Sequence, residues 1–523
     1  MSNTKDLSEL YKNITKERGK PLDSWEVTAL LEVYGIRDID AKQEYGFENV
    51  FEMAKYMMQY KEIKKYPVKS LVKFEELPPL FLRMLKNYLR GLAFAMPMFV
   101  QIFFTLSIGY AIWSGLEMDK TKATVIAVGT FLALVVTGAS AQAIGRKGLF
   151  YLKQGEVILA ANITKKLLAI GYTLVFIIGF ILIILNMFFE IFPNYYFFIM
   201  ISFYLLLSIL FLNVSIYYMF EEYNTILLFF VIGVFFTYIS HSILKVRLPE
   251  AQFISLVILD AIIIFFTNKR IRNLKKEDLS AEGEATPRAS ILFYSLIPFY
   301  LYGFFYFIFL VTDRMVAWSN YSDAKPYFIW FNVPYELGLD WALIALVLLM
   351  GLTEISIHEF MYRINDLVVQ YKYKDYQQFN NTIYAFFKKY NFIYLILSIF
   401  IILLTYYSVY FLDKYGNYMF TKVFFQGFTP FIYWIAAISY AFLVNGLMNV
   451  LFMFSFSRQN FSLKAILIAS IVNLLVGIIL SRMFGLEYAV YGLLCGSIVF
   501  WFISFFYAVK MFKKLEYYYY SSF

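Results

Sequence analysis

The feature that most constrains this chain is a series of apolar segments, each about as long as a lipid bilayer is thick. A membrane-crossing helix needs roughly 20 mostly apolar residues, and 61% of this chain is hydrophobic, well above the share in soluble domains. The sequence therefore predicts an all-α polytopic membrane protein with about twelve transmembrane helices. The expected segments are 91–115, 123–145, 167–189, 195–218, 225–244, 253–267, 291–311, 328–358, 392–412, 429–454, 464–484 and 488–510.

Lysine and arginine are distributed unevenly between the loops on the two sides of these segments. Loops on the same side of the membrane as the amino terminus are rich in lysine and arginine, whereas loops on the opposite side are poor in them. In membrane proteins this excess is carried by the cytoplasmic loops. We therefore expect a multi-pass protein of the cytoplasmic membrane with both termini in the cytoplasm. The same bias accounts for the formal net charge of +9 without a nucleic-acid partner. The basic residues include Arg146, Lys147, Lys165, Lys166, Lys269, Arg270, Arg272, Lys388 and Lys389.

The most polar internal loop divides the apolar segments into two groups of six. Six spans on each side of a cytoplasmic linker give both groups the same orientation, as in transporters built from parallel repeats. The expected parts are a cytoplasmic helical module (1–75), an N-terminal six-helix bundle (76–267), a cytoplasmic linker (268–290) and a C-terminal six-helix bundle (291–523).

The amino-terminal module is expected to contain at least two helices. Asp23 and Glu26 are placed as N-cap and N3 of a helix that Gly35 would end, and Asn49 can cap a second helix over 50–60. The module is either a solvated cap with a minimal core or a docking surface for a cytoplasmic partner. A separate amphipathic helix is expected over 75–90, where basic residues suit the inner headgroup layer.

Residues that would support enzyme or cofactor chemistry are scarce. The chain has no Walker loop for direct ATP hydrolysis, and its only histidines and cysteine are His241, His358 and Cys495, which cannot form a zinc-type cluster. We expect no cofactor, no metal and no enzymatic activity. The competing class is a membrane glycosyltransferase, which would need a sizeable extracytoplasmic loop that this sequence does not offer.

Charged residues at membrane depth mark the candidate functional region. An ionisable group in a bilayer-length helix costs about 2.5–3.5 kcal/mol by insertion scales and usually faces a protein interior or a wet cavity. Asp313 and Arg314 close one apolar helix and are gating candidates. Glu336 and Asp340 follow four residues apart on one helical face. They are expected to bind substrate, or one of them pairs with Arg314 to close the outer mouth.

Further candidates lie elsewhere in the apolar segments. Asp260 sits near the centre of a short span, where a carboxylate either bonds a neighbouring helix or exchanges an ion. Asn445 and Asn449 share a helical face and either bind substrate or pack. Trp330 and Tyr335 either stack on sugar rings or form an interfacial aromatic belt.

Three stretches resemble a known family. LVTDRMVAW (310–318), WFNVPYELGLDWALI (330–344) and FSFSRQNFSLKAILIASIVNLLVG (454–477) are similar to the Pel-type exopolysaccharide exporters of the MOP flippase superfamily. The resemblance covers most of residues 90–510. It implies two six-helix bundles around a central cavity, alternating access, a glycan substrate with cationic amino sugars, and a cytoplasmic glycosyltransferase with other export-complex subunits as partners.

The predicted function is therefore export of a polysaccharide or glycan across the cytoplasmic membrane, coupled to an ion gradient. Membrane lipids are expected around the bundles. A drug or lipid-linked precursor exporter of the same fold is the alternative.

Overall fold

The structure is a computed structural model that describes residues 7, 10, 23–60, 79–116, 118–153, 156–277, 289–320, 329–370, 376–416, 424–425 and 427–520. The described residues form helices and no sheet, and twelve of the helices are long and apolar enough to cross a membrane. This confirms the predicted fold class and number of spans. The chain divides into two compact units, one made of residues 1–79 and 276–289 and the other of the membrane-spanning remainder.

Within 23–60, the structure describes three short helices of the amino-terminal module: α2 (Ser24–Val33), α3 (Asp38–Gln43) and α4 (Val50–Tyr60). The predicted caps are confirmed, because the Asp23 carboxylate accepts from the Glu26 amide at 2.8 Å and the Asn49 side chain accepts from the Glu52 amide at 2.8 Å. Apolar residues at helical spacing on α2 and α4 form the small core. Helix α3 was not predicted, because its six residues are too few to show a periodic pattern.

The first six membrane helices form the N-half. They are α5 (Leu80–Ile108), α6 (Lys120–Lys153), α7 (Val157–Phe189), α8 (Asn194–Met219), α9 (Tyr223–Tyr238), which continues into a π-helical turn η1 (Ile239–Ile243), and α10 (Leu248–Glu277).

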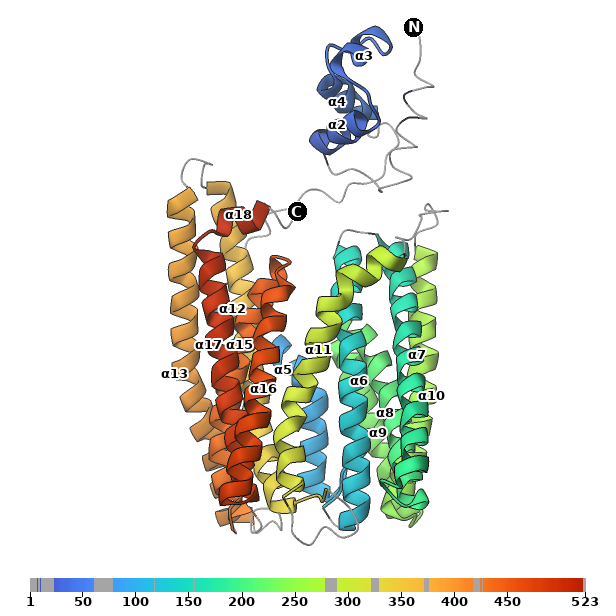
Figure 1. Ribbon diagram of the computed structural model, residues 1–523, viewed down its shortest axis with the longest axis vertical. Helices are drawn as coiled ribbons and strands as arrows, with labels where there is room; N and C mark the ends of the chain where they lie inside the picture. Colours follow the sequence, from blue (N-terminus) through green and yellow to red (C-terminus); the bar gives the residue numbers. More distant parts are fainter. Residues whose placement is uncertain are drawn as a thin grey trace. The chain divides into compact units, whose positions relative to one another are not determined.

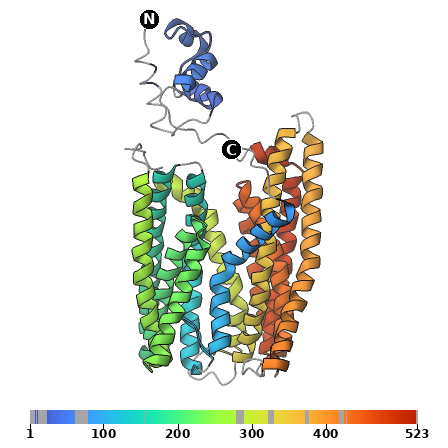
Figure 2. The same cartoon turned by 180° about the vertical axis from the view of Figure 1, so that it is seen from behind.

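The remaining six form the C-half. They are α11 (Ala289–Trp318), α12 (Val333–Gln370), α13 (Tyr376–Gly416), α15 (Thr429–Ser455), α16 (Gln459–Phe484) and α17 (Val490–Phe512). A 3-10 turn η3 (Leu486–Ala489) precedes α17, and the short helix α18 (Leu515–Tyr520) follows it. We call the end with α18 the linker end, where α5 also starts (Figure 2), and the end where α11 finishes and α12 begins the distal end (Figure 1).

The first helix of each half crosses toward the other half. The helix α11 runs diagonally between the two bundles in Figure 1, and α5 is bent in the reverse view of Figure 2. Each contains a proline, Pro97 in α5 and Pro298 in α11, which removes a backbone hydrogen bond and bends a helix. The part of α11 around Gly303 lies against α6 of the N-half. A Cβ on Gly303 would be 2.5 Å from the Gly138 carbonyl oxygen.

The start of α5 is attached to α12 of the C-half. A Cβ on Gly91 would lie 2.7 Å from the Met350 carbonyl oxygen, so glycine permits this close approach of the two backbones. Residues just beyond α5 contact the N-half instead, since the Gln252 side chain donates to the Ala111 carbonyl at 3.0 Å. Both halves therefore share α5.

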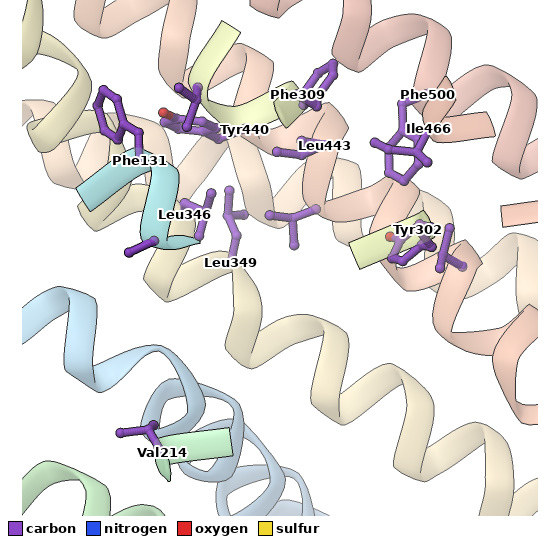
Figure 3. Close-up of a cluster of buried hydrophobic side chains, with 14 of the residues drawn as sticks. Phe131, Val214, Tyr302, Phe309, Leu346, Leu349, Tyr440, Leu443, Ile466 and Phe500 are labelled. Atoms are coloured by element: carbon purple, nitrogen blue, oxygen red, sulfur yellow. The ribbon is translucent and has the colours of Figure 1, made fainter. Parts of the chain in front are cut away.

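A continuous apolar cluster fills the membrane part. Figure 3 shows a portion of it, with Phe131 of α6, Phe309 of α11, Leu346 of α12 and Leu443 of α15 among its side chains. The cluster connects helices of both halves, so the halves pack through side chains as well as through the two crossing helices.

The structure corrects one expectation and settles another. The separate amphipathic helix expected over 75–90 was wrong in its described part: α5 runs without interruption from Leu80 through its basic and apolar residues, and 75–78 lie outside the described residues. The helix α12 begins at Val333, with Pro334 in the first turn, where a missing amide costs nothing. The helix α10 extends to Glu277 and takes up part of the expected linker, of which 278–288 lie outside the described residues.

Candidate functional site

The candidate site lies at the distal end, where α11 finishes and α12 begins. The Arg314 Nε atom is 3.5 Å from a carboxylate oxygen of Glu336, and both side chains are largely buried, at 13% and 8% exposed. The other oxygen of Glu336 accepts from the indole N–H of Trp318 at 3.0 Å. Helix α12 starts three residues before Glu336, so this carboxylate also stands at the positive end of the helix dipole.

Two more carboxyl groups belong to this site. The Tyr335 hydroxyl donates to one oxygen of Asp313 at 3.1 Å, while the other Asp313 oxygen is buried without a hydrogen-bond partner in the described residues. Asp340 lies one turn after Glu336 and lines the same cavity as Glu336 and Arg314. The spacing of four residues thus places both acids on the cavity side of α12.

The charges of this cluster do not balance. Arg314 interacts electrostatically with all three carboxyl groups, those of Asp313, Glu336 and Asp340. It is also the only basic residue among the described residues that line the cavity. If all three acids are ionised, two negative charges have no partner in a largely buried site, where unpaired charges are costly. The cluster is therefore suited to take up protons or a cationic group.

The cavity itself has a volume of about 150 Å³ and is lined from both halves. It is smaller than the roughly 300–1,000 Å³ of ordinary ligand pockets. In this conformation it is a narrow space beside an ion pair rather than an open binding chamber. Its lining comes from α5, α6, α11, α12 and the connection between α5 and α6.

Contacts from α6 join the distal ends of the two halves. The Arg314 guanidinium lies over the Phe131 ring at 5.6 Å, and Phe131 stacks on Trp318 with ring centroids 5.4 Å apart. The Thr124 hydroxyl accepts from the Phe331 amide at 3.0 Å. No sequence pattern indicates that Thr124 or Phe131 belongs to the site. Many apolar and hydroxyl residues occur in these helices, and only the contacts in the structure identify these two.

Asp260 occupies a different place, inside the N-half on α10. Its side chain is 4% exposed, and neither carboxylate oxygen has a hydrogen-bond partner in the part of the chain that the structure describes. Tyr172 of α7 interacts electrostatically with it, and Asn213 of α8 donates to the Tyr172 hydroxyl at 2.7 Å. Two helices, α7 and α8, thus supply a linked tyrosine and asparagine on the side of α10 that carries this buried carboxylate.

The other candidates do not gather at the distal cavity. Asn445 and Asn449 are fully buried on α15, where Asn449 donates to the Ser504 hydroxyl at 3.5 Å. Trp330 is partly buried beneath the Lys120 ammonium, at 5.8 Å from its ring centre, and Tyr335 is fully buried. Tyr335 positions the Asp313 carboxylate rather than facing the cavity in this conformation.

Ion pairs also connect the halves at the linker end. The Arg83 guanidinium makes two hydrogen bonds of 2.6 Å to Glu359. Arg90 contacts Glu221 of the α8–α9 turn and Glu354 of α12, the latter at 3.6 Å. These pairs were not predicted, because their members are far apart along the chain.

No protein-family model and no curated protein matches this chain by sequence. Its fold matches solved MATE transporters. One is a mutant form of the Vibrio cholerae MATE transporter VcmN, with a TM-score of 0.57, 12% identity, and coverage of 82% of this chain and 95% of that chain.

Two further matches are an outward-facing and an inward-facing structure, each described as a multidrug resistance MATE family transporter of the MOP superfamily. The outward-facing structure has a TM-score of 0.50 at 14% identity and covers 84% of this chain and 96% of that one. The inward-facing structure has a TM-score of 0.50 at 12% identity and covers 83% and 98%. At these identities the matches establish the fold: two six-helix halves of the MATE type.

Proposed function

Starting from this MATE-type fold, we propose that the chain is an alternating-access transporter that exports a glycan bearing cationic amino sugars across the cytoplasmic membrane. The observation that carries the proposal is the excess of carboxyl groups over bases where the two halves meet at the distal end. Arg314 neutralises one of the three acids, and a protonated amino group on the substrate would neutralise another.

The electrostatic attraction is strong enough to select a cation. Two unit charges 4 Å apart interact by about 4 kcal/mol at an effective dielectric of about 20, against about 1 kcal/mol in water. Glu336 and Asp340 line a small cavity between buried helices, so the lower dielectric applies to a group that enters it. A neutral sugar of the same size would not gain this energy.

The Arg314–Glu336 pair serves as the distal gate in this proposal. It ties α11 to α12, and Arg314 also lies over Phe131 of α6. Opening toward the distal side requires separation of Arg314 from Phe131, and a cationic substrate that approaches Glu336 competes with Arg314 for the same carboxylate. Substrate binding and gate opening would then be coupled.

Asp260 is the proposed ion-coupling residue. A buried carboxylate without hydrogen-bond partners binds a proton or a metal cation more readily than one already satisfied by donors. Its place inside the N-half, apart from the distal cluster, would allow ion binding to bias the packing of α7, α8 and α10.

A drug exporter is the second candidate, and the fold comparison favours it, because two of the matched structures are described as a multidrug resistance transporter. A small organic cation would be drawn to the same carboxylates. A lipid-linked precursor exporter of the same fold is a third. A membrane glycosyltransferase has the least support, since the structural matches are transporters.

The test uses purified protein in proteoliposomes with two matched oligosaccharides, one with free amino groups and the same one fully N-acetylated. Wild-type protein should move the cationic form. The Glu336→Gln/Asp340→Asn double variant should lose at least tenfold of that flux and keep its flux of the acetylated form.

Other results of this transport experiment would support the alternative functions. If the double variant leaks both compounds, the acids act only as a gate. Equal, tight transport of both forms by the variant would contradict both roles. If wild-type protein moves a small organic cation and neither oligosaccharide, the drug-exporter function is correct.

A further inference from the structure

A second cavity lies at the linker end of the C-half, far from the distal cluster along the helices. It is a groove of about 640 Å³ between the start of α13 and the turn that leads from α17 into α18. Its lining residues are amides, tyrosines, two lysines and one glutamate: Tyr376, Gln377, Asn380, Asn381, Lys513, Lys514, Glu516, Tyr517 and Tyr518.

One wall of the groove is fixed by a buried asparagine. The Asn380 side chain is 5% exposed, donates to the Glu516 carboxylate and accepts from the Glu516 amide at 3.2 Å. Beneath it, the Phe387 ring packs on Phe512 with centroids 4.5 Å apart and on Phe505 at 5.5 Å. The groove is therefore a built feature of the α13–α17–α18 contact.

The charge of the groove is positive. Lys513 and Lys514 are exposed, and neither has an acidic partner within ion-pair distance among the described residues. The Glu516 carboxylate is already held by Asn380. Arg458 lies 4.8 Å from the ring centre of Tyr518 and adds a further positive charge behind the lining. The free ligand positions are thus the ammonium groups of the two lysines.

The depth of the groove matches that of lipid headgroups. The apolar span of α17 ends at Phe512, directly before the two lysines. Below this level α13 and α17 expose large apolar side chains, such as Phe392 at 64% and Phe506 at 59%, as lipid-facing helices do. Tyrosines prefer the same headgroup level. An anionic group in the groove would therefore have room for acyl chains along the helices beneath it.

We propose that this groove binds the phosphate-bearing headgroup of an anionic membrane lipid, with Lys513 and Lys514 contacting the phosphate. Basic pockets between transmembrane helices bind such headgroups on the cytoplasmic side. Lipid binding in this groove would not depend on which substrate the protein transports.

The test uses the full-length protein in neutral detergent, titrated with phosphatidylglycerol and followed by native mass spectrometry. Given the usual contribution of one lysine near an anionic membrane surface, loss of both lysines should weaken the affinity for the lipid roughly 30-fold. The Lys513→Gln/Lys514→Gln variant should show this loss, and the Lys513→Arg/Lys514→Arg variant should retain binding. The matched control, Lys388→Gln/Lys389→Gln, changes two exposed lysines of α13 that do not line the groove, and should bind like wild type.

Three results would overturn the proposal. The first is unchanged lipid retention by the Lys513→Gln/Lys514→Gln variant. The second is an equal loss in the Lys388→Gln/Lys389→Gln control, which would indicate general surface charge. The third is displacement of the lipid by millimolar inorganic phosphate with no preference for the lipid form, which would make the groove a site for free phosphate. Thermal unfolding of each variant without added lipid shows whether it is folded.

Discussion

The guanidinium of Arg83 and the carboxylate of Glu359 form a bidentate ion pair with two hydrogen bonds of 2.6 Å, although the two residues are 276 positions apart in the chain. The pair attaches the beginning of α5, the first helix of the N-half, to α12 of the C-half. Its side chains are only 15% and 7% exposed. Opposite charges that are largely shielded from water therefore join the two halves at the linker end.

Loss of one member of the Arg83–Glu359 pair should be costly. Removal of one partner from a buried ion pair leaves an uncompensated charge, and typical losses are about 3 kcal/mol. Arg83→Gln and Glu359→Gln should each lower the thermal unfolding temperature in detergent. The double variant should be less destabilised than the sum of the two; strict additivity would mean that the pair contributes nothing.

The close approach of α5 to α12 should make Gly91 intolerant of a side chain. Gly91→Ala places a Cβ 2.7 Å from a backbone oxygen, so the helices must separate, at a cost of about 1–3 kcal/mol. Gly145 on α6 is a matched helical control with open space around a Cβ. Gly145→Ala should be neutral or stabilising by up to about 1 kcal/mol. Equal effects of the two substitutions on unfolding would contradict the packing argument.

Asp260→Asn should separate stability from transport. The substitution keeps the shape and removes a charge that has no hydrogen-bond partner in the described residues, so unfolding should be unchanged or shifted to higher temperature. Ion-driven substrate uptake into proteoliposomes should fall at least tenfold. Normal ion-driven uptake by this variant would leave Asp260 as a packing residue.

Helix α3 of the amino-terminal module should depend on pH in the acid range. Hydrogen bonds from the Arg37 side chain and from its backbone amide hold the pKa of Asp40 below the ordinary value of 3.8. A carboxyl with a lowered pKa stabilises the folded state above its unfolded pKa, and the effect is lost as pH falls through the folded value. Protection of α3 amides, corrected for intrinsic exchange, should therefore persist to about pH 4 and then decline. Asp40→Asn should reduce this protection at neutral pH.

The linker end should face the cytoplasm. In a Cys495→Ser background, Asn273→Cys on α10 and Asp119→Cys before α6 would place exposed thiols at opposite ends of the N-half. A membrane-impermeant maleimide added to intact cells should label position 119 and not position 273. The reverse pattern would refute the orientation inferred from lysine and arginine.

The parts of this protein that depend on local pattern could be predicted from the sequence. Bilayer-length apolar runs produced the correct number of spans, and the Asp23 and Asn49 caps were correct because a cap involves residues only three positions apart. Helix ends were less accurate. The helix α13 begins at Tyr376, well before its apolar run, because polar residues at its linker end continue the same hydrogen-bonded helix.

Contacts between distant segments could not be predicted. The spacing of Glu336 and Asp340 placed both acids on one face, but it left open whether an acid would pair with Arg314, and the answer depends on how α11 meets α12. Phe131 and Thr124 join that site from α6, and nothing in their local sequence distinguishes them from other apolar or hydroxyl residues.

The attachment of α5 to α12 has a consequence for how the chain is made. Glu359 is the 276th residue that the ribosome adds after Arg83. At about 5–20 residues per second, that interval lasts on the order of fifteen seconds to one minute. During this time α5 lies in the membrane without one of the two surfaces that it finally packs against, so the packing of the N-half is completed only after α12 of the C-half has been made.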